Sequence, residues 1–245
     1  MNLETILTPA EIPALARRDL GDTACVVFDI LRATSTFVTA LHHGAAAIIP
    51  VSEISEAIAC RQRQPDVLLA GERNGIKISA AQSGGVDFDF GNSPREFRPE
   101  KVRGKTIVST TTNGTRALQA CAAAKIVLAA SFLNLSATAK FLNQLELETI
   151  LLICAGTGEG VALEDVLAAG ALADLLAGER ADATEVARQN FLRSKLDLAV
   201  AIAGSTNGRR LLGLSELRAD VAFCSQRDVF DLVAVMSADG SLRQL

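Results

Sequence analysis

Short runs of β-branched and aliphatic residues alternate along the chain with longer stretches rich in Ala and Leu. Short apolar runs bounded by turn residues indicate buried strands, and the longer stretches indicate helices. The short runs predict strands over residues 24–29, 46–51, 67–70, 105–109, 125–130, 149–154 and 229–236. The longer stretches predict helices over residues 33–43, 52–64, 115–123, 135–145, 163–176 and 183–203. This alternation is typical of a three-layer α/β/α fold with a mostly parallel sheet.

Three of the predicted strands end in a polar turn that opens directly into a helix. The three segments read CVVFDILRATSTFVTAL, TIVSTTTNGTRALQAC and ILLICAGTGEGVALEDVLAAG. Their similarity fits an internal duplication, although a repeated βαβ arrangement alone produces the same rhythm. We expect one compact unit over residues 1–245. A shift in composition near residues 99–104 marks the alternative boundary, which would divide the chain into about 1–100 and 105–245.

Local signals refine this picture at a few positions. Ser52 and Asn134 stand where helix N-caps are expected. The stretch from residue 71 to residue 99 has no strong periodicity, and loops of that length inside compact domains are usually functional or disordered. Its glycines either let it close over a substrate or simply form turns.

Composition and charge exclude several classes of function. Hydrophobic residues make up 49% and charged residues 21% of the chain, which is typical of a globular protein. No segment approaches the roughly 18–20 apolar residues that span a bilayer, and the N-terminus lacks the features of a secretory signal, so we expect a cytoplasmic protein without a membrane partner. The net charge is −4, and Trp and Tyr are absent, which argues against nucleic-acid binding.

The cysteines and histidines do not indicate a metal site, a disulfide framework or a catalytic histidine. The five cysteines are scattered singly and form no C-x-x-C pair, so neither a structural zinc site nor a disulfide framework is expected. The two histidines, His42 and His43, are adjacent, and neighbours on a helix point about 100° apart, so they cannot grip one metal ion together. Catalysis by histidine is therefore disfavoured.

The polar turns supply the candidate catalytic and binding residues. Ligands of open α/β sheets bind beyond the carboxyl ends of the strands, where helix N-termini offer free N–H groups to an anion. The charged and amide side chains predicted to be catalytic are Asp29, Arg32, Asn113 and Arg116. Neighbouring positions predicted to bind substrate are Thr34, Ser35, Arg73, Thr111, Thr112, Gly114, Thr115, Gly156 and Thr157. The alternative roles are helix capping for the hydroxyls and ion pairing for the arginines.

The common phosphate-binding templates do not match. The chain has no GxxxxGK[ST] loop and no C-x5-R loop. Residues 156–160 give GxGxG, which falls short of the GxGxxG dinucleotide motif. Asp29 follows a strand but is followed two residues later by Leu31, so the DxD motif of haloacid-dehalogenase phosphatases is also missing.

Carboxylates near the strand ends point instead to a hard cation. Mg²⁺ prefers oxygen ligands and usually takes one or two carboxylates together with water and substrate phosphate. The predicted ligands of a Mg²⁺ ion are Asp29, Glu72, Glu164 and Asp165. Arginines beside them would take up the remaining charge of a phosphate ester, so the sequence predicts a small, highly anionic phosphate ester as substrate.

Six motifs in order along the chain resemble a known family: DILRATST (29–36), AGERNG (70–75), DFGNSP (89–94), TTTNGTRAL (110–118), SFLN (131–134) and CAGTGEGVALEDVLAAG (154–170). From about residue 24 to residue 231, the chain resembles the 2-phosphosulfolactate phosphatase (ComB) family. The resemblance implies an α/β fold peculiar to that family. It also implies Mg²⁺-dependent hydrolysis of 2-phosphosulfolactate to sulfolactate and phosphate, a reaction on the route to coenzyme M. It adds Asn74 and Asn92 to the expected substrate-binding residues.

Two departures from the family pattern lie outside these motifs. Residues 78–86 form a longer connection than is usual, and the C-terminal segment lacks an expected proline. The leading hypothesis is a Mg²⁺-dependent phosphatase acting on 2-phosphosulfolactate or a related phospho-acid. Two other classes stay open: a non-catalytic anion-binding protein, and a nucleotide-linked enzyme that uses residues 156–160. The sequence also leaves open whether water or Asp29 attacks phosphorus, and whether the Ala-rich helices pack internally or between the subunits of a homodimer.

Overall fold

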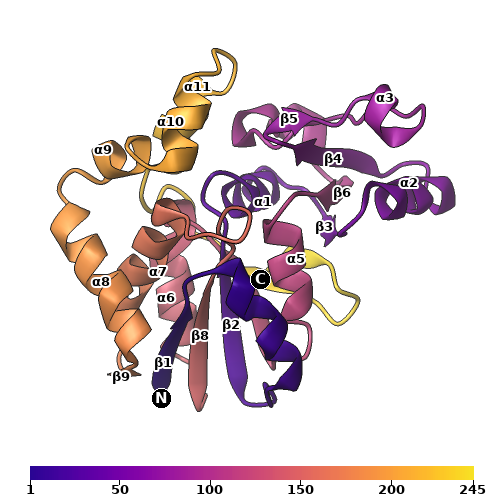
Figure 1. Cartoon of the computed structure of the whole chain (residues 1–245). Coiled ribbons are helices and arrows are strands. Elements are labelled where there is room, and N and C mark those ends of the chain that lie inside the picture. Colours follow the sequence, from indigo (N-terminus) through magenta and orange to yellow (C-terminus); the bar gives the residue numbers. More distant parts are fainter.

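Two blocks of parallel strands and one C-terminal hairpin form the sheet of this protein (Figure 1). The computed structural model describes residues 1–245. The sheet has 11 strands in the order β5-β4-β6-β3-β11-β10-β7-β2-β8-β1-β9. The first block contains β3 (Ala47–Pro50), β4 (Leu68–Arg73) and β6 (Thr106–Thr110), with β5 (Ile76–Lys77) antiparallel at its edge. The second block contains β1 (Asn2–Ile6), β2 (Thr23–Phe28), β7 (Ile126–Ala130), β8 (Thr149–Cys154) and β9 (Glu179–Arg180).

The C-terminal hairpin joins the two blocks into one sheet. Its strands are β10 (Ala234–Met236) and β11 (Leu242–Gln244). β10 pairs antiparallel with β7 of the second block, and β11 pairs antiparallel with β3 of the first block. The last residues of the chain therefore hold together two sets of strands that the preceding sequence builds separately.

Helices cover both faces of the second block, which explains why its central strands β2, β7 and β8 are largely apolar. All six residues of β2 are buried. Val26 and Phe28 share a core cluster with residues of α6 (Leu135–Leu142), α7 (Leu163–Leu175) and α8 (Asp182–Ser194). Val27 faces the opposite side, toward η1 (Pro9–Arg17), α1 (Ala33–His42) and α5 (Gly114–Ala120). Together with α2 (Ile54–Arg63), which packs on β4 and β6, these helices confirm the predicted three-layer α/β/α fold with a mostly parallel sheet.

The predicted elements differ from the structure in specific places. Six predicted strands correspond to β2, β3, β4, β6, β7 and β8. The seventh begins only at Ala234, because the backbone N–H groups of Asp228 and Phe230 donate to η3 (Phe132–Asn134) instead of to a strand. The predicted helix over residues 183–203 is two helices, α8 and α9 (Leu198–Ala203), and Leu196 between them is 92% exposed.

Of the two predicted N-caps, one is correct. Asn134 is the N-cap of α6. Ser52 is not the N-cap of α2, because Glu53 occupies that position and forms a capping box with Glu56. The pattern also did not predict β1, β5, β9 or β11. β5 and β9 have two residues each and lie at the two edges of the sheet, and β1 and β11 lie near the two ends of the chain.

The stretch from residue 71 to residue 99 contains regular structure that the periodicity did not predict. β4 continues to Arg73, and a two-residue turn leads back into β5. Asn74 and Gly75 form this turn with φ of 56° and 82°, which is the arrangement that Asn-Gly favours in tight hairpins. The rest of the stretch contains α3 (Ala80–Ser83) and η2 (Pro94–Glu96), and α4 (Pro99–Val102) follows it. The Asn-Gly pair is the sequence signal that identifies the hairpin.

The C-terminal third places two further helices above the carboxyl ends of the second block (Figure 1). These are α10 (Thr206–Leu212) and α11 (Arg218–Cys224). Both pack beside α9, and α11 also packs against η2. No helix of the protein combines the length and the apolar character that crossing a bilayer requires.

Close packing between α7 and α8 yields a prediction about stability. A Cβ atom on Gly170 of α7 would overlap the backbone carbonyl group of Ala187 in α8. We expect Gly170→Ala to lower the free energy of unfolding by about 1–3 kcal/mol, the usual effect of overpacking a core. Gly213→Ala is the matched control, since its Cβ would meet ordinary contacts from 3.4 Å outward. Urea denaturation of both variants checks this, and equal losses would contradict the packing account.

Candidate active site

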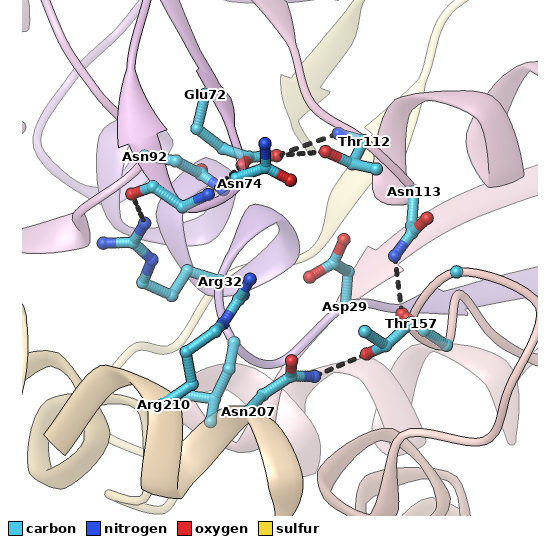
Figure 2. A pocket seen from close by; sticks show the side chains of 14 residues that line it. Asp29, Arg32, Glu72, Asn74, Asn92, Thr112, Asn113, Thr157, Asn207 and Arg210 are labelled. Carbon is cyan, nitrogen blue, oxygen red and sulfur yellow. Dashed lines mark hydrogen bonds between the residues drawn. The ribbon is translucent and has the colours of Figure 1, made fainter. Parts of the chain in front are cut away.

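A polar cavity of about 210 Å³ lies where the loops after β2, β4, β6 and β8 meet α10 (Figure 2). Only one of the 14 residues that line it is hydrophobic. The lining residues are Asp29, Leu31, Arg32, Glu72, Asn74, Gly75, Asn92, Thr112, Asn113, Gly156, Thr157, Gly158, Asn207 and Arg210. The strand-end loops of both blocks thus contribute to one site, as ligand binding at the carboxyl ends of an α/β sheet requires.

Asp29 lies between β2 and α1, and its carboxylate points into the cavity (Figure 2). Its Oδ1 accepts a hydrogen bond of 3.1 Å from the backbone N–H of Ala33 in the first turn of α1. A Cβ atom on Gly114 would lie 2.7 Å from Oδ2 of Asp29, so only glycine lets α5 approach this carboxylate so closely. The start of α1 and the start of α5 therefore fix the position of Asp29 from two sides.

The acidic side chains around Asp29 raise its pKa. Burial is the largest cause, and the charges of Glu72 and Glu164 add to it, whereas the hydrogen bond from Ala33 opposes it. The pKa of Asp29 rises from the ordinary 3.8 to about 6. The pKa of Asp165 is also raised, mainly by burial and then by the charges of Asp29 and Glu164. None of these four carboxylates forms a salt bridge, so the cluster carries negative charge without a basic partner.

Burial of the Asp29 charge, together with its repulsion by Glu72 and Glu164, predicts a stability gain when that charge is removed. Because the folded pKa lies above the unfolded value, ionised Asp29 destabilises the fold, and the penalty appears as the pH rises from about 4 to about 6. In EDTA at pH 8, we expect Asp29→Asn to raise the free energy of unfolding by up to about 3 kcal/mol, at about 1.4 kcal/mol per pKa unit. The gain should vanish near pH 4. Urea denaturation at both pH values measures it, and a pH-independent change would contradict the electrostatic cause.

Glu72 connects two loops of the site. Its Oε1 accepts hydrogen bonds of 2.9 Å from both the backbone N–H and the hydroxyl group of Thr112. Its Oε2 accepts a bond of 2.6 Å from the backbone N–H of Gly75 in the hairpin turn. Across the cavity, Asn113 Nδ2 donates to the carbonyl oxygen of Gly156 at 2.8 Å. These bonds join the loops after β4, β6 and β8 into one wall.

Glu164 lies behind that wall at the start of α7 and is 1% exposed. Its Oε1 accepts a hydrogen bond of 2.7 Å from Asn207 Nδ2, but its Oε2 is buried with no hydrogen-bond partner. Asp165 beside it is 2% exposed and accepts from the backbone N–H groups of Ile30 at 2.8 Å and Gly156 at 3.0 Å. Asp165 therefore fixes the loops after β2 and β8, while Glu164 leaves one oxygen unsatisfied.

Arg32 is buried and fully engaged. Its Nη1 donates to Oδ2 of Asp220 in α11 at 2.7 Å, and its Nη2 donates to the carbonyl oxygen of Gly75 at 2.7 Å. Ser93 donates to the second oxygen of Asp220 at 2.7 Å. Arg32 therefore connects the loop after β2, the β4–β5 hairpin and α11.

Comparison with known proteins shows which family the chain belongs to. The family model described as 2-phosphosulpholactate phosphatase matches residues 6–239. The chain belongs to the 2-phosphosulfolactate phosphatase family. A protein of Thermotoga petrophila, named probable 2-phosphosulfolactate phosphatase, is 43% identical over 212 residues, which cover 86% of this chain and 88% of the relative.

Two further relatives carry the same name. The protein of Caldanaerobacter subterraneus subsp. tengcongensis is 41% identical over 224 residues, covering 88% of each chain. The protein of Thermosynechococcus vestitus is 35% identical over 244 residues, covering 95% of each chain. The predicted resemblance to the 2-phosphosulfolactate phosphatase family is thereby confirmed.

About half of the predicted site residues lie on the cavity wall. Those that line the cavity are Asp29, Arg32, Glu72, Asn74, Asn92, Thr112, Asn113, Gly156 and Thr157. They come from the loops after four different strands and from the hairpin, which is the edge of the sheet where ligands of α/β proteins are expected.

Arg116 and Arg73 were expected at the site, but neither lines the cavity. Arg116 is exposed and pairs with Glu53 at 3.3 Å. It follows Gly114 by two positions on α5, which turns it about 200° away from the face that meets Asp29. Arg73 follows Glu72 on β4, so its side chain leaves the opposite face of the strand, where it donates to Thr110 Oγ1 at 3.0 Å.

Several predicted binding residues support the wall from behind. The hydroxyl of Thr34 donates to the backbone oxygen of Asp29 at 3.1 Å, and that of Ser35 donates to Ile30 at 2.9 Å. The hydroxyl of Thr115 donates to the backbone oxygen of Thr111 at 3.1 Å. The members of this group that do not line the cavity are Thr34, Ser35, Thr111, Gly114, Thr115, Glu164 and Asp165. Local backbone bonds use the hydroxyls, and burial keeps the two acids off the cavity surface, so these residues position the wall in this structure. Their direct binding of substrate or metal stays a prediction.

Three polar residues of the C-terminal helices were not predicted. Asn207 and Arg210 of α10 line the cavity, and Asp220 of α11 holds Arg32. No strand precedes these helices, so reasoning from strand ends did not reach them. The polar string STNGRR over residues 205–210, between two apolar stretches, is the signal that marks this segment.

Proposed function

We propose that this protein is a phosphatase that hydrolyses 2-phosphosulfolactate to sulfolactate and phosphate. The observation that carries the proposal is the Asp29 carboxylate, held at a strand end in a small polar cavity that also contains two arginines. Family membership and the shared name of the relatives support this substrate. A small cavity with many polar groups suits a three-carbon ester that carries several charges.

We propose Mg²⁺ as the cofactor, and the residues present fit it. No three His, Cys, Asp or Glu side chains are grouped to hold a metal alone, but Mg²⁺ needs only one or two carboxylates beside water and phosphate. Asp29 and Glu72 line the cavity and would hold the ion, while the orphaned oxygen of Glu164 and the buried Asp165 add negative charge from behind. A bound Mg²⁺ would neutralise charge that develops on the phosphoryl oxygens.

The chain's own groups orient the ester. Thr112 and Asn113 from the loop after β6, and Thr157 from the loop after β8, present polar side chains toward the same cavity, and the wall bonds of Glu72 and Asn113 fix those two loops. We propose that water attacks phosphorus: a new P–O bond forms, and the bond from phosphorus to the ester oxygen breaks. The stereochemical course at phosphorus tests this, because direct attack by water inverts the configuration, whereas a phosphoenzyme on Asp29 would give net retention through two successive inversions.

The setting of the reaction follows from the same features. We propose that the protein acts in the cytoplasm on a small soluble ester and binds no nucleic acid, in keeping with its net charge of −4 and its lack of Trp and Tyr. Formation of a homodimer stays a prediction. Size-exclusion chromatography with light scattering would measure it.

A phosphate-release assay across a panel of phospho-acids tests the function. We expect turnover of 2-phosphosulfolactate with Mg²⁺, and loss of turnover in EDTA that added Mg²⁺ restores. Binding of the panel without release would favour the anion-binding alternative. Calorimetric titration with NAD(P) and ATP addresses the nucleotide-linked alternative, and we expect no binding.

A further inference from the structure

Two guanidinium groups reach the cavity, and only one of them has a protein partner (Figure 2). Both Nη atoms of Arg32 are engaged, by Asp220 and by the Gly75 carbonyl, and the side chain is 3% exposed. Arg210 forms no salt bridge and no hydrogen bond, although it lines the same cavity. Arg210 is thus the cation whose charge is free to meet a ligand.

The hairpin turn leaves room beside this free charge. A Cβ atom on Gly75 would lie 3.8 Å from Nη2 of Arg210 and 3.9 Å from Nη2 of Arg32. The two guanidinium groups therefore face the same point from different elements. An anion at that point would meet both guanidinium groups, and because Asp220 already pairs with Arg32, the charge still available to the anion is that of Arg210.

Helix α10 fixes the direction of Arg210. Asn207 Nδ2 donates to Thr157 Oγ1 at 2.6 Å and to Glu164 Oε1 at 2.7 Å, which ties the first turn of α10 to the loop after β8 and to α7. Residues three apart lie on the same face of a helix, so the face anchored by Asn207 also carries Arg210 into the cavity. These bonds hold α10 in place independently of any substrate, and the exposed Arg210 side chain extends from it beside the cavity.

Charge across the cavity is unevenly distributed. Asp29 and Glu72 contribute carboxylates, and Glu164 and Asp165 add negative charge behind them. Arg210 enters from the opposite wall, formed by α10 (Figure 2). If a cation bound by the carboxylates neutralises the phosphoryl group, the remaining anionic part of the ester would lie near Arg210.

We propose that Arg210 binds a second anionic group of the substrate, one that is not transferred, and thereby makes this site selective for phospho-acids that carry a carboxylate or sulfonate beside the ester. This proposal rests on the proposed function, because it assumes that the phosphoryl group lies at Asp29. Guanidinium matches both oxyanions through paired N–H donors, which an ammonium group cannot reproduce.

The test compares two esters of similar size. 2-Phosphosulfolactate carries two additional anionic groups, whereas glycerol 2-phosphate carries neutral hydroxyls at the corresponding positions. We expect Arg210→Ala to lower kcat/KM for 2-phosphosulfolactate about 10- to 100-fold, mainly through KM, as for the loss of a charge-assisted hydrogen bond. The kcat/KM for glycerol 2-phosphate should fall far less than that for 2-phosphosulfolactate, and Arg210→Lys should recover only part of the selectivity.

Arg209→Ala is the matched control. Arg209 is the preceding residue of α10, is exposed, donates to the Gly204 carbonyl and does not line the cavity, so neither ester should be affected. An equal loss for both esters in Arg210→Ala, or no loss, would overturn the proposal.

Calorimetric titration with sulfolactate separates this proposal from the proposed function. If the wild type releases no phosphate from any ester, the function fails, and weaker sulfolactate binding in Arg210→Ala than in wild type still supports the Arg210 subsite. Sulfolactate binding that is equal in both proteins, or absent from both, overturns the subsite.

Discussion

Asn in place of Asp29 is expected to reduce kcat for phosphate release by about 10³-fold or more, in the range seen when a central catalytic group is lost. Asp29 is the carboxylate that faces the cavity, and the starts of α1 and α5 fix it within hydrogen-bond reach of Ala33. Asparagine keeps the shape and can still accept that bond, but it removes the charge that would hold Mg²⁺. Steady-state phosphate release at saturating Mg²⁺ measures the loss.

The same strand supplies the control for this experiment. Asp22 precedes β2, whereas Asp29 follows it, so the two carboxylates lie at opposite ends of one strand. Asp22 is exposed and pairs with Lys125. Asp22→Asn should retain full turnover. Full activity of Asp29→Asn at saturating Mg²⁺ would remove Asp29 from the mechanism.

Asp220→Ala is expected to lower the free energy of unfolding by about 3–5 kcal/mol, as for other buried ion pairs that lose one member. Asp220 is 0% exposed, and its carboxylate accepts from Arg32 and from Ser93. Alanine would leave the Arg32 guanidinium buried with only the Gly75 carbonyl as partner. Urea denaturation gives the loss of stability.

An exposed ion pair provides the comparison. Arg18 and Glu4 lie 2.9 Å apart, but each side chain is 37% exposed, so Glu4→Ala should cost about 1 kcal/mol or less. We also expect Asp220→Ala to impair turnover, because Arg32 positions the hairpin turn through Gly75. Similar losses of stability in the two variants would contradict the assigned role of burial.

The part of the site that follows strands was predictable from the sequence. Asp29 and Asn113 follow the ends of β2 and β6 by one and three residues, Glu72 is the second-last residue of β4, and parallel strands bring such positions to one edge. The hydrophobic pattern predicted that these residues lie at the carboxyl edge of the sheet, but it did not predict where each side chain points. Arg116 points away from the cavity, because the two positions from Gly114 to Arg116 turn it about 200° from the helix face that meets Asp29.

The rule that ligands bind at the carboxyl ends of strands could not predict the residues that the C-terminal helices contribute to the site. Arg210 and Asp220 lie more than 170 residues from Arg32 and Asp29, and only the packing of α10 and α11 above the sheet brings them together. Periodicity cannot report such a long-range pairing. The Asn-Gly turn at Asn74 is different, because it is a local signal of the hairpin that β-run counting overlooked.

The most direct test of the account is a ³¹P NMR time course of 2-phosphosulfolactate with Mg²⁺, recorded with wild type and with Asp29→Asn side by side. The account predicts that wild type converts the ester signal into inorganic phosphate, whereas the variant leaves it unchanged. An ester signal that persists with wild type, or that disappears at the same rate with both proteins, would contradict the claim that the Asp29 cavity catalyses this hydrolysis.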